Sequence, residues 1–268
     1  MQAHENAYIP RPVKVLNNLR ETPENFILTL GLRLAHEPGQ FLQVSVLGVG
    51  EAPISIASWG GDTITLHICE VGNVTRALGA CRPGDTVFVR GPFGNGFPMY
   101  DTWGHNLVLA GGGSGLASLK GVIEYVHRHR DDYGDVTIFL GFRNAGEVIF
   151  PDRIEHWRIH FPVYVSLDTL SDGHCLDASE GFVTDLMRRT DIPPGENAAL
   201  LCGPPVMMRL AAQVLEDKGL RDDHIYLSLE RLMYCAIGKC CHCMIGDKYT
   251  CLDGPVFRWG ALKEHMND

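Results

Sequence analysis

Four cysteines near the end of the chain constrain its fold more than any other feature. They follow the spacing C-x4-C-x2-C-x7-C, and they are Cys235, Cys240, Cys243 and Cys251. The spacing begins as in plant-type 2Fe–2S sites, and soft thiolates suit iron held in a compact cluster. Gly238 and Gly246 let the intervening loop turn its amides toward the sulfurs. We therefore expect a cysteine-rich tail that folds around a 2Fe–2S cluster.

A structural zinc site is the alternative for the same residues. The four cysteines and His242 also offer the ligands of tetrahedral zinc. Zinc sites usually contain paired C-x2-C steps, however, and only one such step is present here, so the spacing favours iron. Cys241 lies beside a predicted ligand, and the sequence leaves open whether it is a spectator or an alternative ligand.

The composition excludes several classes of function. The chain has 268 residues, 45% of them hydrophobic, so we expect two domains with an appendage. A net charge of −9 argues against non-specific binding to nucleic acid or to an anionic membrane. No apolar run reaches membrane-spanning length, and the start lacks the features of a secretion signal. Nine cysteines then suit a reducing, cytoplasmic environment, in which we expect Cys69, Cys81 and Cys175 to be ordinary thiols.

Short strands dominate the first hundred residues. Runs rich in β-branched residues occupy residues 13–16, 25–30, 41–46, 63–68 and 86–90. Turn signals containing glycine or proline separate them. Many short strands at near-regular spacing are typical of a small closed barrel. We therefore predict a β-barrel domain over residues 1–101.

After residue 101 the pattern becomes an alternation of strands and helices. Strands are predicted at residues 107–110, 136–140, 163–167 and 198–202, and helices at residues 116–129, 152–157, 181–189 and 204–218. Such alternation implies a parallel sheet with helices on both faces. We predict an α/β domain over residues 102–223 and assign residues 224–268 to the cysteine-rich tail.

Two turns of the α/β domain have the features of a nucleotide site. Residues 111–115, Gly-Gly-Gly-Ser-Gly, and residues 202–205, Cys-Gly-Pro-Pro, each connect a predicted strand to a helix. Ligands bind at the carboxyl ends of such strands, and bare amides at a helix N-terminus suit a pyrophosphate. Close packing alone also explains a glycine-rich turn. Arg143, just beyond the next strand, is equally consistent with a phosphate contact and with an ordinary surface arginine.

The barrel contains two weaker candidates. Residues 52–55, Ala-Pro-Ile-Ser, follow a predicted strand and offer a hydroxyl to a flavin ring. Residues 72–75, Gly-Asn-Val-Thr, open a predicted helix whose amides suit a diphosphate. Taken alone, each is an ordinary turn.

In combination, these motifs resemble those of the ferredoxin–NADP reductase superfamily. The matching segments are residues 38–41 (Pro-Gly-Gln-Phe), 52–55, 111–115 and 202–205, in that order. The cysteine tail with residues 252–257, Leu-Asp-Gly-Pro-Val-Phe, is similar to the iron–sulfur flavoprotein branch. That branch includes the electron-transfer subunit of dihydroorotate dehydrogenase, the gamma subunits of cytoplasmic nickel–iron hydrogenases, the corresponding subunit of anaerobic sulfite reductase and the small subunit of NADH-dependent ferredoxin:NADP oxidoreductase.

The resemblance implies three cofactors: FAD on the barrel, NAD(P)(H) on the sheet and a 2Fe–2S cluster in the tail. It implies Ser55 and Cys202 as the residues nearest the reacting rings. The implied FAD ligands are Ala52, Pro53, Ile54, Ser55, Gly72, Asn73, Val74 and Thr75. The implied nucleotide ligands are Gly112, Gly113, Ser114, Gly115, Arg143, Cys202 and Gly203. The implied cluster ligands are Cys235, Cys240, Cys243 and Cys251.

Three departures from the superfamily pattern matter. Ala52 stands where the flavin motif usually begins with arginine, so a phosphate contact is lost and a weaker or different hold on FAD is expected. Ala236 follows the first cluster cysteine, where glycine is usual. The C-terminal aromatic residue that covers the flavin in the reductases has no counterpart in residues 263–268.

The resemblance also implies an electron-transfer subunit. Nicotinamides exchange hydride, iron–sulfur clusters pass single electrons, and a flavin converts between the two, so no side-chain base is required. The expected partners are catalytic redox subunits of a hydrogenase or sulfite reductase complex. Other iron–sulfur subunits or ferredoxin are further candidate partners. The first alternative is an electron-transfer subunit of dihydroorotate dehydrogenase or of a bifurcating transhydrogenase. The second alternative is a zinc-stabilised scaffold without a redox role. Residues 228–231, Ser-Leu-Glu-Arg, favour the first type.

Overall fold

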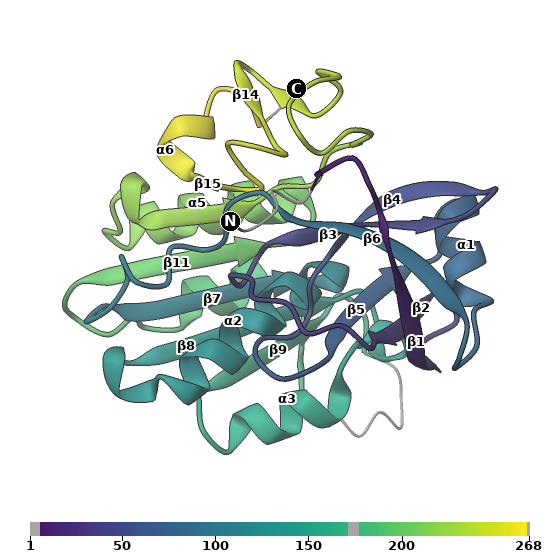
Figure 1. The fold of residues 1–268 in the computed structure, drawn as a ribbon. Helices are drawn as coiled ribbons and strands as arrows, with labels where there is room; N and C mark the ends of the chain where they lie inside the picture. Colours follow the sequence, from purple (N-terminus) through teal and green to yellow (C-terminus); the bar gives the residue numbers. More distant parts are fainter. Residues whose placement is uncertain (1–5, 171–176, 267–268) are drawn as a thin grey trace.

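The structure has three parts that follow one another along the chain. A computed structural model describes residues 6–170 and 177–266. An antiparallel barrel comes first, a seven-stranded sheet with helices comes second, and the cysteine-rich tail lies against both (Figure 1). Cys175 lies outside the described residues. Within those residues, the structure contains no helix that is both long and apolar enough to cross a membrane.

Six antiparallel strands form the barrel, in the order β4-β3-β6-β1-β2-β5. Their bounds, with that of the one helix, are β1 (Arg11–Arg20), β2 (Asn25–Leu30), β3 (Phe41–Val46), β4 (Gly50–Ser55), β5 (Ile64–Cys69), α1 (Asn73–Gly79) and β6 (Thr86–Phe93). A bridge between Ile56 and Leu66 joins the two edges of the sheet. Alternate residues of β2 point inward, so Phe26, Leu28 and Leu30 are fully buried. The predicted barrel is confirmed.

The second part is a sheet in the order β10-β9-β8-β7-β11-β12-β15, parallel except at β15. The strands are β7 (Asn106–Gly112), β8 (Val136–Phe142), β9 (Val163–Leu167), β10 (Ser179–Glu180), β11 (Asn197–Cys202), β12 (Ile225–Ser228) and β15 (Val256–Arg258). The helices are α2 (Leu116–Arg128), α3 (Pro151–Arg158), α4 (Val183–Arg189) and α5 (Pro205–Asp217). Short 3-10 turns are η1 (Gly113–Gly115), η2 (Arg130–Asp132), η3 (Ala145–Glu147) and η4 (Asp222–His224).

Helices cover both faces of this sheet, as predicted. Leu119 and Ile123 of α2 share one buried cluster with Trp157 of α3. Met187 of α4 and Leu215 of α5 belong to a second cluster. Figure 1 shows α3 and α5 on opposite sides of the strands. Burying each such side chain contributes about 1.5–3 kcal/mol, so the sheet is a rigid base for the turns at its strand ends.

The tail returns to both other parts. It contains a hairpin, β13 (Met244–Ile245) with β14 (Lys248–Tyr249), and the short helix α6 (Trp259–Leu262). Its strand β15 pairs antiparallel with β12 and so becomes the edge strand of the sheet. On the barrel side, Phe41 and Phe93 pack against the loop that contains Cys243 and Cys251.

Two of the strands that differ from the prediction bear on the predicted motifs and boundaries. Residues 52–55, expected to follow a strand, lie inside β4, where Pro53 is tolerated because β4 is an edge strand. Strand β12 lies beyond residue 223 yet pairs with β11, so the sheet extends into residues assigned to the tail. The domain boundaries at residues 101 and 223 therefore remain our proposal.

Candidate functional site

The four spaced cysteines come together in the loop that follows β12. Cys243 and Cys251 are buried, whereas Cys235 and Cys240 are partly exposed. The thiols lie close enough to influence one another, because Cys235 acts on Cys240, and both Cys243 and Cys235 act on Cys251. Four thiols gathered in one loop suit a cluster of two irons, which needs four cysteine thiolates.

Backbone amides point at the cysteine sulfurs. The amide of Lys239 donates to Cys235 Sγ at 3.2 Å, and the amide of Gly238 donates to Cys251 Sγ at 3.2 Å. Backbone hydrogen bonds, the largest from His242, lower the pKa of Cys240 to about 7. Amide hydrogen bonds of this kind stabilise cluster sulfurs and tune the reduction potential. The donor set therefore fits the predicted 2Fe–2S cluster.

Loop conformation accounts for the residues beside these ligands. Ala236 and Cys241 both have a φ of 60°, in the left-handed region that favours glycine. The methyl group of Ala236 therefore adds backbone strain of about 1–2 kcal/mol where the superfamily usually has glycine. The thiol of Cys241 is exposed and lies 3.4 Å from the hydroxyl of Tyr249. This contact outside the four spaced cysteines favours the spectator interpretation of Cys241.

A cavity of about 790 Å³ lies at the carboxyl ends of β7, β11 and β12. Its lining includes every residue predicted for the nicotinamide nucleotide: Gly112, Gly113, Ser114, Gly115, Arg143, Cys202 and Gly203. Cys69 and Val71 of the barrel also line it, as do Glu230 and Ile245 of the tail. All three parts of the chain therefore share one cavity.

The two strand-to-helix turns touch each other in the cavity wall. A Cβ on Gly115 would lie 2.4 Å from the carbonyl oxygen of Cys202, and one on Gly203 would lie 2.9 Å from the amide nitrogen of Gly112. Gly113 has a φ of +53° and open space where a Cβ would be. These turns thus present bare backbone at the start of α2, where an anionic pyrophosphate binds in sheets of this kind. The residues fit a dinucleotide.

Cys202, at the end of β11, is buried beside two hydroxyl groups. Burial raises the pKa of its thiol to about 12, so the thiol is neutral at pH 7. Ser118 and Ser228 interact with it, and Ser228 is its partner in the register of β11 and β12. A neutral thiol does not act as a nucleophile, in keeping with the expectation that no side-chain base is required. The predicted contact of Cys202 with a reacting ring stays a prediction.

Arg143 is placed at the cavity without a strong partner of its own. Its side chain is 80% exposed, and its guanidinium lies 4.0 Å from the carboxylate of Glu147. A surface pair of this kind contributes at most about 1 kcal/mol, so the side chain is available to a phosphate. The phosphate role stays a prediction.

Glu230 is a site residue that the sequence analysis did not single out. It lines the cavity, and the surrounding protein raises the pKa of its carboxyl group by desolvation. Ser228, two residues earlier, ends a third parallel strand. The rule that ligands bind at the carboxyl ends of strands would have identified this segment, had β12 been predicted.

The two predicted flavin motifs are neighbours in the barrel. Ser55 ends β4, and Gly72 precedes α1, which packs against β4. The hydroxyl of Thr75 accepts hydrogen bonds from the amides of Val71 and Gly72, at 3.0 and 2.9 Å, and so fixes the start of α1. Residues 52–55 and 72–75 are not in the cavity lining as far as the chain is described. Their contacts with FAD stay a prediction.

Two family models match the chain. An oxidoreductase NAD-binding domain matches residues 109–213. The iron–sulfur cluster binding domain of dihydroorotate dehydrogenase B matches residues 230–263. The first range contains both strand-to-helix turns and the second contains all four spaced cysteines. The predicted nucleotide and iron–sulfur cofactors are confirmed by these matches.

Curated relatives cover nearly the whole chain. Sulfhydrogenase 2 subunit gamma of Pyrococcus furiosus is 37% identical and covers 93% of this chain and 89% of its own length. A probable dihydroorotate dehydrogenase B (NAD(+)), electron transfer subunit of Thermoplasma volcanium is 32% identical, covering 91% of this chain and 88% of its own.

A solved structure has the same fold along almost the full length. It is that of NADH-dependent reduced ferredoxin–NADP oxidoreductase, described for flavin-based electron bifurcation. The TM-score is 0.78 with 24% identity, covering 95% of this chain and 92% of that one. The predicted order of barrel, nucleotide-binding sheet and cysteine tail is therefore confirmed.

Proposed function

Because this chain belongs to the oxidoreductase family of sulfhydrogenase gamma subunits and dihydroorotate dehydrogenase electron transfer subunits, we propose that it carries electrons between NAD(P)(H) and a partner enzyme. The observation that carries this function is the cavity to whose wall the barrel, the sheet and the tail all contribute. When bound, FAD, the nicotinamide nucleotide and the 2Fe–2S cluster supply hydride exchange and single-electron transfer.

The residues of the cavity bind and orient the nucleotide. Gly113 and Gly115 present bare backbone to a pyrophosphate, and Arg143 is free to approach a phosphate. Phe182 and Val206 line the cavity with exposed apolar side chains, which offer a surface to a planar ring. Neutral Cys202 lies at the base of the same wall and would position a ring without exchanging a proton with it.

Arg90 of β6 holds the tail against the barrel. It is buried, pairs with Glu51 of β4, and donates a hydrogen bond to the carbonyl oxygen of Cys235 at 3.1 Å. The first cluster ligand is therefore tied to the strand that contains the predicted flavin motif. Electron transfer between two sites requires a fixed separation, which rigid supports of this kind provide.

We infer that the partner is a hydrogenase of the sulfhydrogenase type, since a sulfhydrogenase gamma subunit is 37% identical to this chain. Leu232, Tyr234 and Leu252 are exposed apolar residues of the tail, and we propose this face for docking. A role with dihydroorotate dehydrogenase is the second candidate, favoured by the family model that matches the tail. We also propose a cytoplasmic location, because a reducing environment suits the cluster thiolates and the other described cysteines, which are free.

Anaerobic purification followed by a visible spectrum, flavin and metal analysis, and NADH or NADPH titration tests the function. About one FAD and two irons per chain, bleached by one of the nucleotides, are expected. Cys243→Ser should lose iron, whereas the control Cys241→Ser should retain it. One zinc per chain, with no flavin and no bleaching, would contradict the proposal. The activity of co-purifying subunits distinguishes the two candidate partners. Hydrogen consumption indicates a hydrogenase, and oxidation of dihydroorotate indicates dihydroorotate dehydrogenase.

A further inference from the structure

Two histidines and a glutamate meet at the end of the sheet opposite the cavity. His105 directly precedes β7, Glu196 directly precedes β11, and His224 directly precedes β12. These three strands are neighbours in the sheet and run parallel. Their starts therefore lie side by side at the amino edge, and the cavity lies at the carboxyl edge. A strand of seven residues separates the two edges by about 20 Å.

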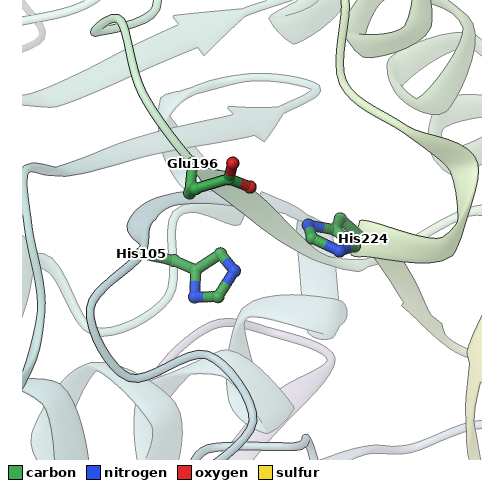
Figure 2. Close-up of side chains that lie close together, drawn as sticks. All are labelled: His105, Glu196 and His224. Atoms are coloured by element: carbon green, nitrogen blue, oxygen red, sulfur yellow. The ribbon is translucent and has the colours of Figure 1, made fainter.

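The three side chains converge on one point (Figure 2). One ligand atom of each lies within 4.8 Å of the ligand atoms of the other two. The two imidazole rings have centroids 5.4 Å apart, and both histidines are half-buried while Glu196 is exposed. Two imidazoles with one carboxylate is a common ligand set for zinc.

Backbone hydrogen bonds orient both rings. Nδ1 of His105 lies 3.1 Å from the carbonyl oxygen of Trp103, and Nδ1 of His224 lies 3.3 Å from that of Asn197. A carbonyl oxygen only accepts, so each Nδ1 carries the hydrogen and each Nε2 keeps its lone pair. Histidines that bind metals typically donate their other ring N–H to a carbonyl or carboxylate in this way. With Nδ1 facing a carbonyl oxygen in both rings, Nε2 is the nitrogen left for a metal ion.

The backbone of the glutamate is also fixed. Its carbonyl oxygen accepts a hydrogen bond from the amide of Asn106 at 2.9 Å, which locks the start of β11 against the start of β7. A neighbouring carboxylate, that of Asp223, lies 3.9 Å from Nε2 of His224 but is held by the guanidinium of Arg221. Glu196 is therefore the carboxylate available to a cation at this point.

We propose that His105, Glu196 and His224 form a divalent cation site of the zinc class. Nε2 of each histidine and one carboxylate oxygen are the protein ligands, and water completes the tetrahedron. Ligand atoms around zinc lie about 3.4 Å apart, so each side chain needs to move by only about 1 Å. The ion joins three separate segments of the chain at the amino edge of the sheet and stabilises the fold there.

Zinc binding to the holoprotein tests this site. The protein with its flavin and cluster in place is dialysed against a chelator, titrated with Zn²⁺ in competition with a chromophoric chelator, and analysed for metals. We expect one zinc per chain in addition to the cluster iron, and an unfolding temperature that rises with added zinc.

Glu196→Gln, His105→Ala and His224→Ala should each weaken zinc binding by about tenfold or more and abolish the rise in unfolding temperature. The matched control is Glu155→Gln, because Glu155 is an exposed glutamate that pairs with Arg158 on α3. Nucleotide-driven bleaching should be the same in all variants, since the cavity predicted for the nucleotide lies at the other edge of the sheet. Unchanged bleaching also shows that each variant is folded. The proposal is overturned if the wild type binds no zinc. It is also overturned if all variants bind zinc with equal affinity, because the zinc would then be bound by cysteine thiols.

Discussion

Individual glycines set how closely the two turns of the cavity approach each other. At Gly115 a Cβ would lie 2.4 Å from a backbone oxygen, which cannot move aside as a flexible side chain can. Gly121 lies on the same helix, and a Cβ there would be 3.4 Å from its nearest neighbour, the carbonyl oxygen of Ser58. The first position is closed to any side chain, whereas the second has room for a methyl group.

Gly115→Ala is therefore expected to destabilise the protein by about 1–3 kcal/mol, as overpacking does. It should also weaken NAD(P)H binding, because the turn must move away from Cys202. Gly121→Ala should leave NAD(P)H binding unchanged. It should stabilise the protein by at most about 1 kcal/mol, since alanine is the better helix former. Urea unfolding and nucleotide titration measure both quantities. Equal behaviour of the two variants would contradict this account of the turn.

At the scale of elements, Asn95 joins the loop after β6 to the tail. Its side-chain amide donates to the carbonyl oxygens of Asp253 and Val256 at 3.0 and 2.8 Å, and its Oδ1 accepts from the amide of Val256 at 3.0 Å. Strand β15 thus begins at a point fixed by the barrel and continues along β12 of the sheet. Three side-chain hydrogen bonds and the backbone bond from the Asn95 amide to Gly254 thus join the barrel to the tail.

Asn95→Ala should loosen the tail on the barrel, while Arg90 and the backbone hydrogen bond from the amide of residue 95 to Gly254 remain. Because three backbone groups lose their partner, we expect a loss of about 1–3 kcal/mol and faster removal of iron by a chelator. Asn17, an exposed residue of β1, is the matched control, and Asn17→Ala should change neither quantity. Iron release followed by absorbance and unfolding in urea give the two readouts. An unchanged rate of iron release in Asn95→Ala would show that Arg90 and the remaining contacts suffice to hold the tail.

The sequence predicted those elements whose pattern is local. Strand β2 alternates buried and half-buried residues, and α2 places Leu119 and Ile123 on one face, so both were found from periodicity. Strand β4 was missed because Pro53 and Gly50 lower its β-propensity, and only its pairing with β3 makes it a strand. Strand β15 owes its place to a partner about thirty residues earlier, which no local pattern reveals.

The same distinction applies to the sites. Spacing identified the four cysteines, because their ligand pattern is local, and the two glycine turns followed from their places at strand ends. Glu230 and the cluster of His105, Glu196 and His224 depend on which strands become neighbours. Their members are scattered in the sequence, so only the folded sheet brings them together.

At the scale of the whole molecule, Lys120 connects the sheet to the barrel. It is buried on α2, donates to the carbonyl oxygen of Ala57 at 2.9 Å, and pairs with Glu124 at 2.6 Å. Glu124 in turn accepts from the amide of Trp59 at 3.1 Å and pairs with Arg153 of α3 at 3.2 Å. One helix thereby holds the segment that follows β4, next to the predicted flavin motif.

Lys120→Met preserves the volume of the side chain but leaves the carbonyl of Ala57 without its donor, so we expect a loss of about 1–3 kcal/mol. In the wild type, flavin release and loss of secondary structure should occur at the same urea concentration, because Ala57, Phe97 and Met99 of the barrel share one buried cluster with the sheet and so couple the two domains. In the variant, flavin release should move to lower urea and separate from the second transition. Arg188→Met removes an exposed ion pair with Asp185 and should shift stability by less than about 1 kcal/mol. If Lys120→Met instead shows both transitions together at the wild-type midpoint, Lys120 does not couple the two domains. The contacts of Arg90 and Asn95 would then be the ones that hold the three parts around the shared cavity.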